Sequence, residues 1–249
     1  MTPFSFFSKL LIFPLYYFFH YNFVFGLLHK KFIKKFYYKK YIFELNNCDF
    51  PIPFYSSFIF NTYELNDRVL IEKNVTSENK CIIVGGGIGF IGVLTSVISK
   101  NKILIFEINK KILSNLKNNL KKNKIKYSLY PNNLVFQNRN NKKYYFFNQN
   151  FLASSMYRKT NNRLKINNLH FKKIKSLNKY NTLIIDGEGI EKYYIENINK
   201  LKMIKYIFFE FHNDIFSREE KNHLFDILKK NGFTQKDKFI NSYYFSKKK

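Results

Sequence analysis

The sequence predicts an α/β fold, in which a mostly parallel sheet carries helices on both of its faces. From residue 81 onward, short apolar runs alternate with amphipathic stretches of helical length, as expected where crossover helices join parallel strands. A group of glycines follows the first apolar run, and a carboxylate ends each of three later ones. Because ligands of open α/β sheets lie beyond the carboxyl ends of the strands, these residues also predict a binding site.

The expected strands and helices of this domain alternate along the chain. Strands are expected at the runs CIIVG, KILIFE, TLIID and IKYIFFEFH, with a closing pair at DKFIN and SYYFS. Helices are expected over 88–99, 110–122, 190–202 and 218–231, and Gly232 ends the last of them. Residues 127–173 are less regular, with strand-like pieces at NLVFQ and YYFFN.

The segment before this domain has a different pattern. Residues 42–75 predict short strands around Pro51 and Pro53, followed by a polar helix over 64–72. We expect residues 1–41 to form a hydrophobic and basic N-terminal extension, and residues 42–249 to form one catalytic domain.

The extension combines an uncharged apolar run with a basic, aromatic one. Residues 10–28 could just span a bilayer, although Pro14, His20 and Asn22 make the run interfacial in character. The stretch HKKFIKKFYYKKY follows, and at helical spacing its lysines and aromatics fall on opposite faces. The extension is therefore either a helix on the cytoplasmic surface of a membrane or one that packs its aromatics on the domain's own core.

Composition limits the partners and the compartment. The 249 residues include 43 basic and 17 acidic side chains, giving a formal net charge of +26, but Lys, Asn, Ile, Phe and Tyr are abundant throughout. We interpret this charge as a solvated surface and expect no nucleic acid partner, because no nucleic-acid-binding motif is present. Cys48 and Cys81 are too few for a disulfide framework or a zinc site. The sequence thus predicts a cytoplasmic protein and indicates no metal site.

The stretch GGGIGF follows the first predicted strand. Glycines let the backbone turn tightly and approach a ligand, while the next helix presents free N–H groups at its N-terminus. We expect a nucleotide-like cofactor at this loop, against Gly85, Gly86, Gly87, Gly89 and Phe90. The alternative is a turn that needs its glycines only for packing.

Glu107 ends the second predicted strand, where a carboxylate can accept hydrogen bonds from both hydroxyls of a ribose. Together with the glycine loop, it points to an adenosine-containing cofactor. Residues 87–92 also satisfy the fingerprint G-x-G-x-x-G, so NAD stays possible from this loop alone.

A second group of carboxylates stands where the fourth main strand stops and a helix begins. Asp186 and Glu188 are expected to face the same cleft as the glycine loop, with Glu210 and His212 beside them at the end of the next strand. We expect Glu191 to complement the N-terminus of the following helix.

With these residues assembled, the chain from about residue 63 to its end resembles the FkbM family of S-adenosylmethionine-dependent methyltransferases. The motifs stand in the family's order, namely VGGGIGF, FEINKKILSNLKNNLKKN, FLASSM, IIDGEGIE and IFFEFH, with NGF near the end. The resemblance implies a class I methyltransferase-like (Rossmann-like) fold, in which Gly85, Gly87, Gly89 and Glu107 hold S-adenosylmethionine.

The resemblance also implies what the second group of carboxylates does. It places Asp186 and Glu188 at the active site of an enzyme that O-methylates a hydroxyl of a sugar, glycan precursor or related metabolite. An alcohol needs a base to accept its proton. We expect Asp186 to be that base, with His212 as the second candidate and Glu188 as an orienting or sugar-binding group.

The sequence departs from the family pattern at three positions and leaves other function classes open. Ile83 and Ile184 stand where the family carries an acidic residue and a lysine, and Asn109 replaces a proline. These departures make a catalytically inactive, methyltransferase-fold binding protein the main alternative, and a NAD-dependent oxidoreductase is the third class. The acceptor is expected against the irregular segment 131–170, where Ser154, Ser155 and Arg158 lie.

Overall fold

The computed structural model describes residues 23–32, 35–45, 50–136, 144–146, 163–165 and 167–247. The chain divides into two compact units, residues 1–65 and 66–249, each described here by itself. Most of the apolar run 10–28 and the acceptor candidates Ser154, Ser155 and Arg158 lie outside the described residues, and the predicted boundary after residue 41 stays a prediction. Within the described ranges, no helix combines the length and apolar character that crossing a bilayer requires.

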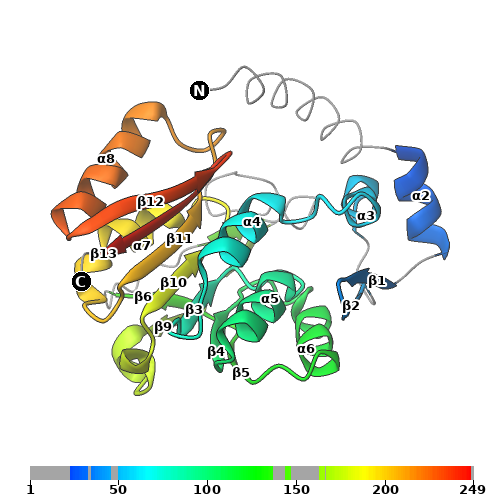
Figure 1. Cartoon of the computed structure of the whole chain (residues 1–249), viewed down its shortest axis with the longest axis horizontal. Coiled ribbons are helices and arrows are strands. Elements are labelled where there is room, and N and C mark those ends of the chain that lie inside the picture. Colours follow the sequence, from blue (N-terminus) through cyan, green and yellow to red (C-terminus); the bar gives the residue numbers. More distant parts are fainter. Residues whose placement is uncertain are drawn as a thin grey trace. The chain divides into compact units, whose positions relative to one another are not determined.

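The larger unit is built on one mixed, mostly parallel sheet of seven strands, which confirms the predicted α/β class (Figure 1). The strand order is β12-β13-β11-β10-β3-β4-β5. Strand β13 runs antiparallel to both of its neighbours, β11 and β12, and the other pairs are parallel. The strands span Cys81–Val84 (β3), Ile103–Phe106 (β4), Tyr127–Tyr130 (β5), Thr182–Ile185 (β10), Tyr206–Glu210 (β11), Phe233–Phe239 (β12) and Ser242–Lys247 (β13).

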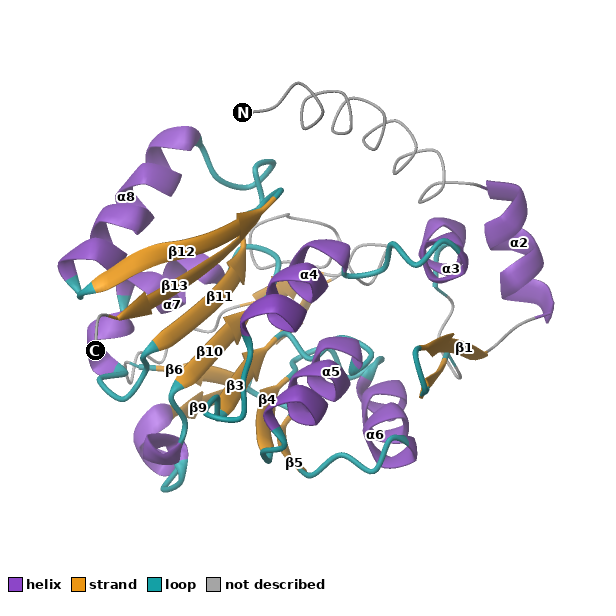
Figure 2. Cartoon of the chain, viewed as in Figure 1, coloured by secondary structure: helices purple, strands orange, loops and turns teal. Residues whose placement is uncertain are grey.

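Helices cover both faces of this sheet (Figure 2). They span Leu65–Asn74 (α4), Phe90–Ser99 (α5), Leu113–Lys122 (α6), Glu191–Glu196 (α7) and Arg218–Lys230 (α8), with single 3₁₀ turns at Phe171–Lys173 (η2), Leu177–Lys179 (η3) and Ile198–Lys200 (η4). The helix predicted over 190–202 is therefore shorter than expected, because it gives way to η4. Helix α8 ends as predicted, with Gly232 at a φ of 82° just beyond it.

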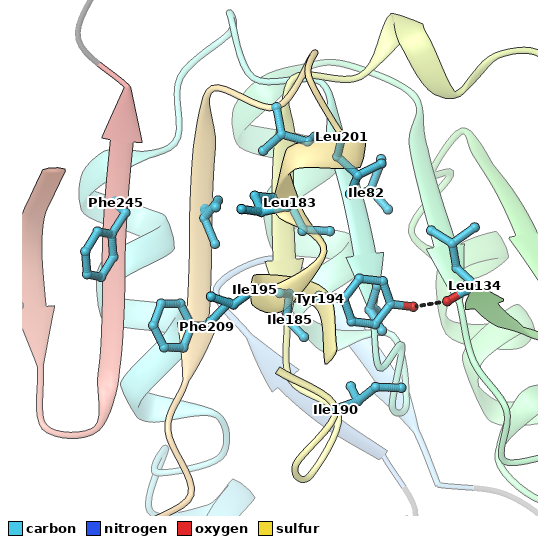
Figure 3. Close-up of a cluster of buried hydrophobic side chains, with 14 of the residues drawn as sticks. Ile82, Leu134, Leu183, Ile185, Ile190, Tyr194, Ile195, Leu201, Phe209 and Phe245 are labelled. Carbon is cyan, nitrogen blue, oxygen red and sulfur yellow. Dashed lines mark hydrogen bonds between the residues drawn. The ribbon is translucent and has the colours of Figure 1, made fainter. Parts of the chain in front are cut away.

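Strand residues alternate between the two faces, which gives each face its own packing. Ile83 and Ile105 face the side of α5 and α6, where Gly86 and Gly92 approach Ile105. The alternate strand residues join one buried cluster with side chains of α7 and α8 (Figure 3). In this cluster the buried hydroxyl of Tyr194 donates a hydrogen bond of 3.1 Å to the carbonyl of Leu134, which fixes the segment after β5 to α7.

The irregular region predicted between β5 and β10 contains short strand pairs. Strands β6 (Asn133–Val135) and β9 (Asn168–His170) pair in parallel, and β7 (Tyr144–Phe146) and β8 (Arg163–Lys165) pair antiparallel. The predictions of strands at NLVFQ and YYFFN are thereby confirmed. The closing pair is also confirmed, as β12 and β13, and a register shift between Gln235 and Asp237 bends β12 at the open edge of the large sheet.

The smaller unit corrects the predicted basic helix over 29–41. Helix α2 (Phe23–Phe32) stops early, and strands β1 (Lys35–Tyr38) and β2 (Tyr41–Glu44) form a hairpin. Residues 35–38 alternate exposed and buried, so the period of this stretch is that of a strand. The buried ring of Phe36 stacks on Phe43 across the hairpin, and Lys35 pairs with Glu44 at 3.3 Å.

The strands predicted around the two prolines are also wrong. Residues Ile52–Ile59 form helix α3, with Pro51 as its N-cap and Pro53 in its first turn. A proline is tolerated there because the first turn of a helix leaves its N–H groups without intrahelical acceptors. The side chains of Phe54 and Phe58 on this helix are buried, and their rings pack edge to face with centroids 4.8 Å apart. The polar helix predicted over 64–72 is confirmed as α4.

Candidate functional site

The predicted loops meet at the point where the strand order of the large sheet reverses. Strands β4 and β5 extend the sheet on one side of β3, and β10 and β11 extend it on the other. Such a switch point opens a crevice at the carboxyl ends of the two central strands. Gly85 and Asp186, the residues directly after β3 and β10, stand there side by side, because the amide of Asp186 donates to the carbonyl of Val84 at 3.0 Å.

The glycines of the loop are explained by packing within the chain. Gly85 has a φ of 89°, and a Cβ on it would overlap the backbone carbonyl of Asp186. A Cβ on Gly86 would lie 2.7 Å from Ile105, and one on Gly89, whose φ is 92°, would lie 3.1 Å from Leu116. These glycines allow the loop to lie close to the strand ends and to α6, whether or not a ligand is bound.

Phe90 and Glu107, the other predicted cofactor residues, are both buried. Phe90 opens α5 and is 3% exposed. Glu107 is 5% exposed, and its two oxygens accept hydrogen bonds from the amides of Gly87, at 2.9 Å, and Asn109, at 2.7 Å. Burial raises the pKa of Glu107 to about 7, although these amide hydrogen bonds oppose the shift.

The predicted catalytic residues come together around one imidazole. Nε2 of His212 lies 3.7 Å from Oδ1 of Asp186 and 3.6 Å from Oε1 of Glu191, and Nδ1 lies 3.6 Å from Oε2 of Glu188. These are ion-pair distances, too long for good hydrogen bonds. The side chains of Asp186 and Glu188 are 24% and 23% exposed, so both are accessible to solvent.

The charge of His212 decides its chemical role. Burial lowers the pKa of this imidazole, but the carboxylates of Asp186, Glu191 and Glu188 outweigh burial and raise that pKa to about 12. His212 is therefore a cation at neutral pH. Because a protonated imidazole cannot accept a proton, the geometry favours Asp186 over His212 as a base.

The loop between β10 and α7 is fixed by Glu191, which was expected only to complement the N-terminus of the helix. Its two carboxylate oxygens accept from the amides of Gly187, at 2.9 Å, and Gly189, at 2.7 Å. Glu188 between them has a φ of 55°, a left-handed conformation that costs a residue with a Cβ about 1–2 kcal/mol. This buried carboxylate thus holds the strained turn that carries Glu188 toward His212.

Two residues of α4 complete the site, and no local pattern in the sequence indicates them. Asp67 is 3% exposed and accepts a hydrogen bond of 2.6 Å from Ser242, and Asn66 donates one of 2.9 Å to Glu210. Burial and the nearby charge of Asp186 raise the pKa of both Asp67 and Glu210 above their ordinary values. The site therefore gathers carboxylates from three segments of the chain, at 67, 186–191 and 210, around one cation, His212.

The two apolar departures from the family pattern are neighbours in the sheet. Ile83 on β3 and Ile184 on β10 are Cα partners in the parallel register, and each is 1% exposed. In the FkbM pattern that the sequence resembles, an acidic residue and a lysine would stand at these adjacent positions, where this chain has an apolar pair. Such an exchange in a core is often neutral or stabilising.

No protein-family model matches the chain, so membership of the FkbM family stays a prediction. No curated protein matches it either.

Among solved structures, the chain is similar to several methyltransferases at low sequence identity. The precorrin-6y C5,15-methyltransferase of Geobacter metallireducens is 13% identical with a TM-score of 0.44, over 72% of this chain and 83% of that one. A methyltransferase of Pyrococcus furiosus is 10% identical with a TM-score of 0.45, over 90% and 94%. The ribosomal protein L11 methylase of Lactobacillus delbrueckii is 12% identical with a TM-score of 0.46, over 74% and 77%. All three TM-scores lie below 0.5, so these similarities add nothing to the α/β fold described above.

Proposed function

We propose that the chain is an S-adenosylmethionine-dependent methyltransferase that methylates a hydroxyl of a sugar, glycan precursor or related small molecule. The observation that carries this proposal is the hydrogen bond between the amide of Gly87 and the carboxylate of Glu107 at the switch point. In a dinucleotide site, the amides of this loop face a pyrophosphate. Here a carboxylate accepts from one of them, which favours an adenosine cofactor without phosphates over NAD.

The charges around the crevice support the same cofactor. When bound, S-adenosylmethionine supplies an activated methyl group on a positively charged sulfonium. Glu107 would hold the ribose hydroxyls, because a carboxylate accepts hydrogen bonds at both of its oxygens. The partly exposed carboxylates of Asp186 and Glu188 suit a cationic ligand and oppose an anionic one.

The acceptor side of the crevice would use the residues around His212. Asp186 would accept the proton of the acceptor hydroxyl, and protonated His212, 3.7 Å away, would hold that carboxylate in position. Glu188 would orient the acceptor, because its strained backbone and its contact with His212 fix the direction of its side chain.

We further propose that the smaller unit binds a membrane surface, as the basic and aromatic sequence predicts. Leu27 and Leu28 are 47% and 49% exposed on α2, next to the basic pair Lys30 and Lys31. Exposed apolar and basic side chains together suit the surface of an anionic bilayer. Co-sedimentation of the full chain with vesicles should therefore require phosphatidylserine and should weaken in a double variant with serine at 27 and 28. Equal sedimentation of wild type and variant would remove this part of the proposal.

Calorimetric titration of the full chain with S-adenosylmethionine, S-adenosylhomocysteine and NADH tests the cofactor. We expect binding of the first two, weakened about tenfold or more by Glu107→Gln. Glu78→Gln is the matched control, since Glu78 is exposed and precedes β3 at the opposite end of the strands. Binding of NADH alone would overturn the proposal, and cofactor binding without transfer to any hydroxyl acceptor would favour an inactive binding protein.

A further inference from the structure

Three potential metal ligands gather at the carboxyl ends of β10 and β11. Asp186, Glu210 and His212 each place one donor atom within 4.8 Å of the donor atoms of the other two. Two carboxylates and one imidazole form a mixed oxygen and nitrogen set, of the kind that binds divalent first-row cations.

Buried polar atoms without a hydrogen-bond partner point to the same place. Six such side-chain atoms occur in the described part of the chain, and three of them are Oδ1 of Asn66, Oδ2 of Asp67 and Nε2 of His212. Native proteins leave few buried polar atoms unsatisfied, and each costs about 1–3 kcal/mol. That half of them adjoin one cluster indicates that the cluster is built to contact something else.

Asp67 is the second, independent sign of a ligand. It is 3% exposed, and one of its carboxylate oxygens lies within 4.8 Å of a carboxylate oxygen of Asp186. Ser242 satisfies Oδ1 of Asp67 at 2.6 Å and leaves Oδ2 without a partner. A carboxylate buried beside other carboxylates is stabilised either by taking up a proton or by a cation close to it.

The spacing of the donor atoms suits an ion better than direct contact. Oδ1 of Asp186 and Nε2 of His212 are 3.7 Å apart, which is too far for a good hydrogen bond. Two ligands that each lie about 2.1 Å from a metal ion can be up to about 4.2 Å apart. A cation between these two atoms would contact both without displacing either strand end.

We propose that Asp186, Glu210 and His212, with Asp67 adjoining them, bind one divalent cation. Mn²⁺ is a suitable probe, because carboxylates suit it and it also accepts an imidazole nitrogen. The ion would take the place of a proton at Nε2 and keep positive charge between the carboxylates, so Asp186 would then bind the ion rather than accept a proton. The ion could also bind an acceptor hydroxyl, and that role rests on the proposed methyl transfer. Binding of the ion itself is independent of the proposed enzyme activity.

The test is a titration of the full chain with Mn²⁺ alone, without cofactor or acceptor, following free Mn²⁺ by electron paramagnetic resonance. We expect one saturable site per chain and a rise in the melting temperature as it fills. Glu210→Gln, which keeps the shape and the acceptor oxygen facing Asn66, should weaken binding about tenfold or more, and Glu78→Gln should leave it unchanged. Absence of saturable binding below millimolar Mn²⁺, or unchanged affinity in folded Glu210→Gln, would overturn the proposal.

A spectroscopic measurement on the wild type covers the case in which Glu210→Gln does not fold. Pulsed resonance of the bound Mn²⁺ should show coupling to an imidazole nitrogen, and His212→Gln should abolish it. A bound ion without nitrogen coupling would place it at another site and overturn the assignment. Because neither measurement involves methyl transfer, failure of the proposed enzyme activity would leave both results intact.

Discussion

Nε2 of His212 lies 3.7 Å from Oδ1 of Asp186, an arrangement that makes the imidazole a counter-ion of the carboxylate rather than its hydrogen-bond partner. Removing the cation by His212→Gln should leave buried carboxylates facing one another and should lower the free energy of unfolding by about 3 kcal/mol. In a chain that already carries Asp186→Asn, His212→Gln should lower the free energy of unfolding by less. Denaturant unfolding of the wild type, the two single variants and the double variant would measure this double-mutant cycle.

The ion pair between Lys192 and Glu220, 2.7 Å long and partly exposed, is the control for that cycle. Lys192→Gln should cost less than about 1 kcal/mol, because solvent screens such a pair. If His212→Gln lowered the free energy of unfolding equally in the wild type and in Asp186→Asn, the imidazole would stabilise the site through packing alone.

Asp186→Asn should separate chemistry from cofactor binding. If Asp186 accepts the acceptor proton, kcat should fall about 10²- to 10⁴-fold, while the Kd for S-adenosylmethionine should stay within about twofold. Transfer of a labelled methyl group to an acceptor found by screening gives kcat, and calorimetry gives Kd. Asp226→Asn, on the exposed side of α8, should change neither. A variant Asp186→Asn that turns over at the wild-type rate would exclude Asp186 as the base.

Glu107 should make stability depend on pH in a defined direction. Burial raises its pKa from the ordinary value of 4.5 to about 7, so the folded chain binds one proton more than the unfolded chain between these values. The stabilisation is fully present below pH 4.5 and is lost as the pH rises through 7, a change of about 3 kcal/mol. Denaturant unfolding of the wild type and of Glu107→Gln at several pH values would show this as a difference that falls with rising pH. A constant difference would mean that Glu107 is ionised throughout.

Two glycines with positive φ should respond very differently to alanine. Gly85→Ala should cost about 3 kcal/mol or more, because its Cβ would overlap the carbonyl of Asp186 and its φ is 89°. Gly232→Ala shares the conformational strain, with a φ of 82°, but its Cβ would meet no atom within 4 Å. Gly232→Ala should therefore lower the free energy of unfolding by only about 1–2 kcal/mol. Thermal unfolding compares them, and equal losses would show that conformation, not the contact with Asp186, demands Gly85.

The apolar pair Ile83 and Ile184 should behave as a coupled unit. Ile83→Glu alone would bury a charge without a partner and should destabilise the chain by about 4 kcal/mol. Adding Ile184→Lys on the neighbouring strand should restore about 1 kcal/mol or more, since the two positions are partners in the register. Additive losses in denaturant unfolding would mean that the two sites do not interact.

The sequence was sufficient to predict the parts of the fold that are local. Apolar runs and glycines identified β3, β4, β10 and β11, and the runs DKFIN and SYYFS indicated the closing pair β12 and β13. It failed for Phe36 and Tyr38, because a short stretch of lysines and aromatics fits both the helical and the strand period until the hairpin buries alternate rings. It also failed at Pro53, which is compatible with the first turn of a helix as well as with a strand end.

The candidate site was predictable only where its residues follow strands. Asp186 and His212 could be placed because the carboxyl ends of neighbouring parallel strands share one edge of the sheet. Asp67 could not, because its partner Ser242 lies 175 positions away and neither residue belongs to a motif. The protonation of His212 depends on carboxylates of residues 186–191, which reach the imidazole only in the folded chain.

The bend in β12 bears on how the chain behaves at high concentration. Strand β12 is an edge strand of the sheet, and the N–H and C=O groups on its outer side could pair with a strand from a second molecule. The register shift at Gln235 and Asp237 interrupts that template, while exposed Lys236 and Lys238 place like charges on any approaching copy. We therefore expect both features to oppose pairing between sheet edges, and straightening the shift or neutralising the two lysines should promote aggregation.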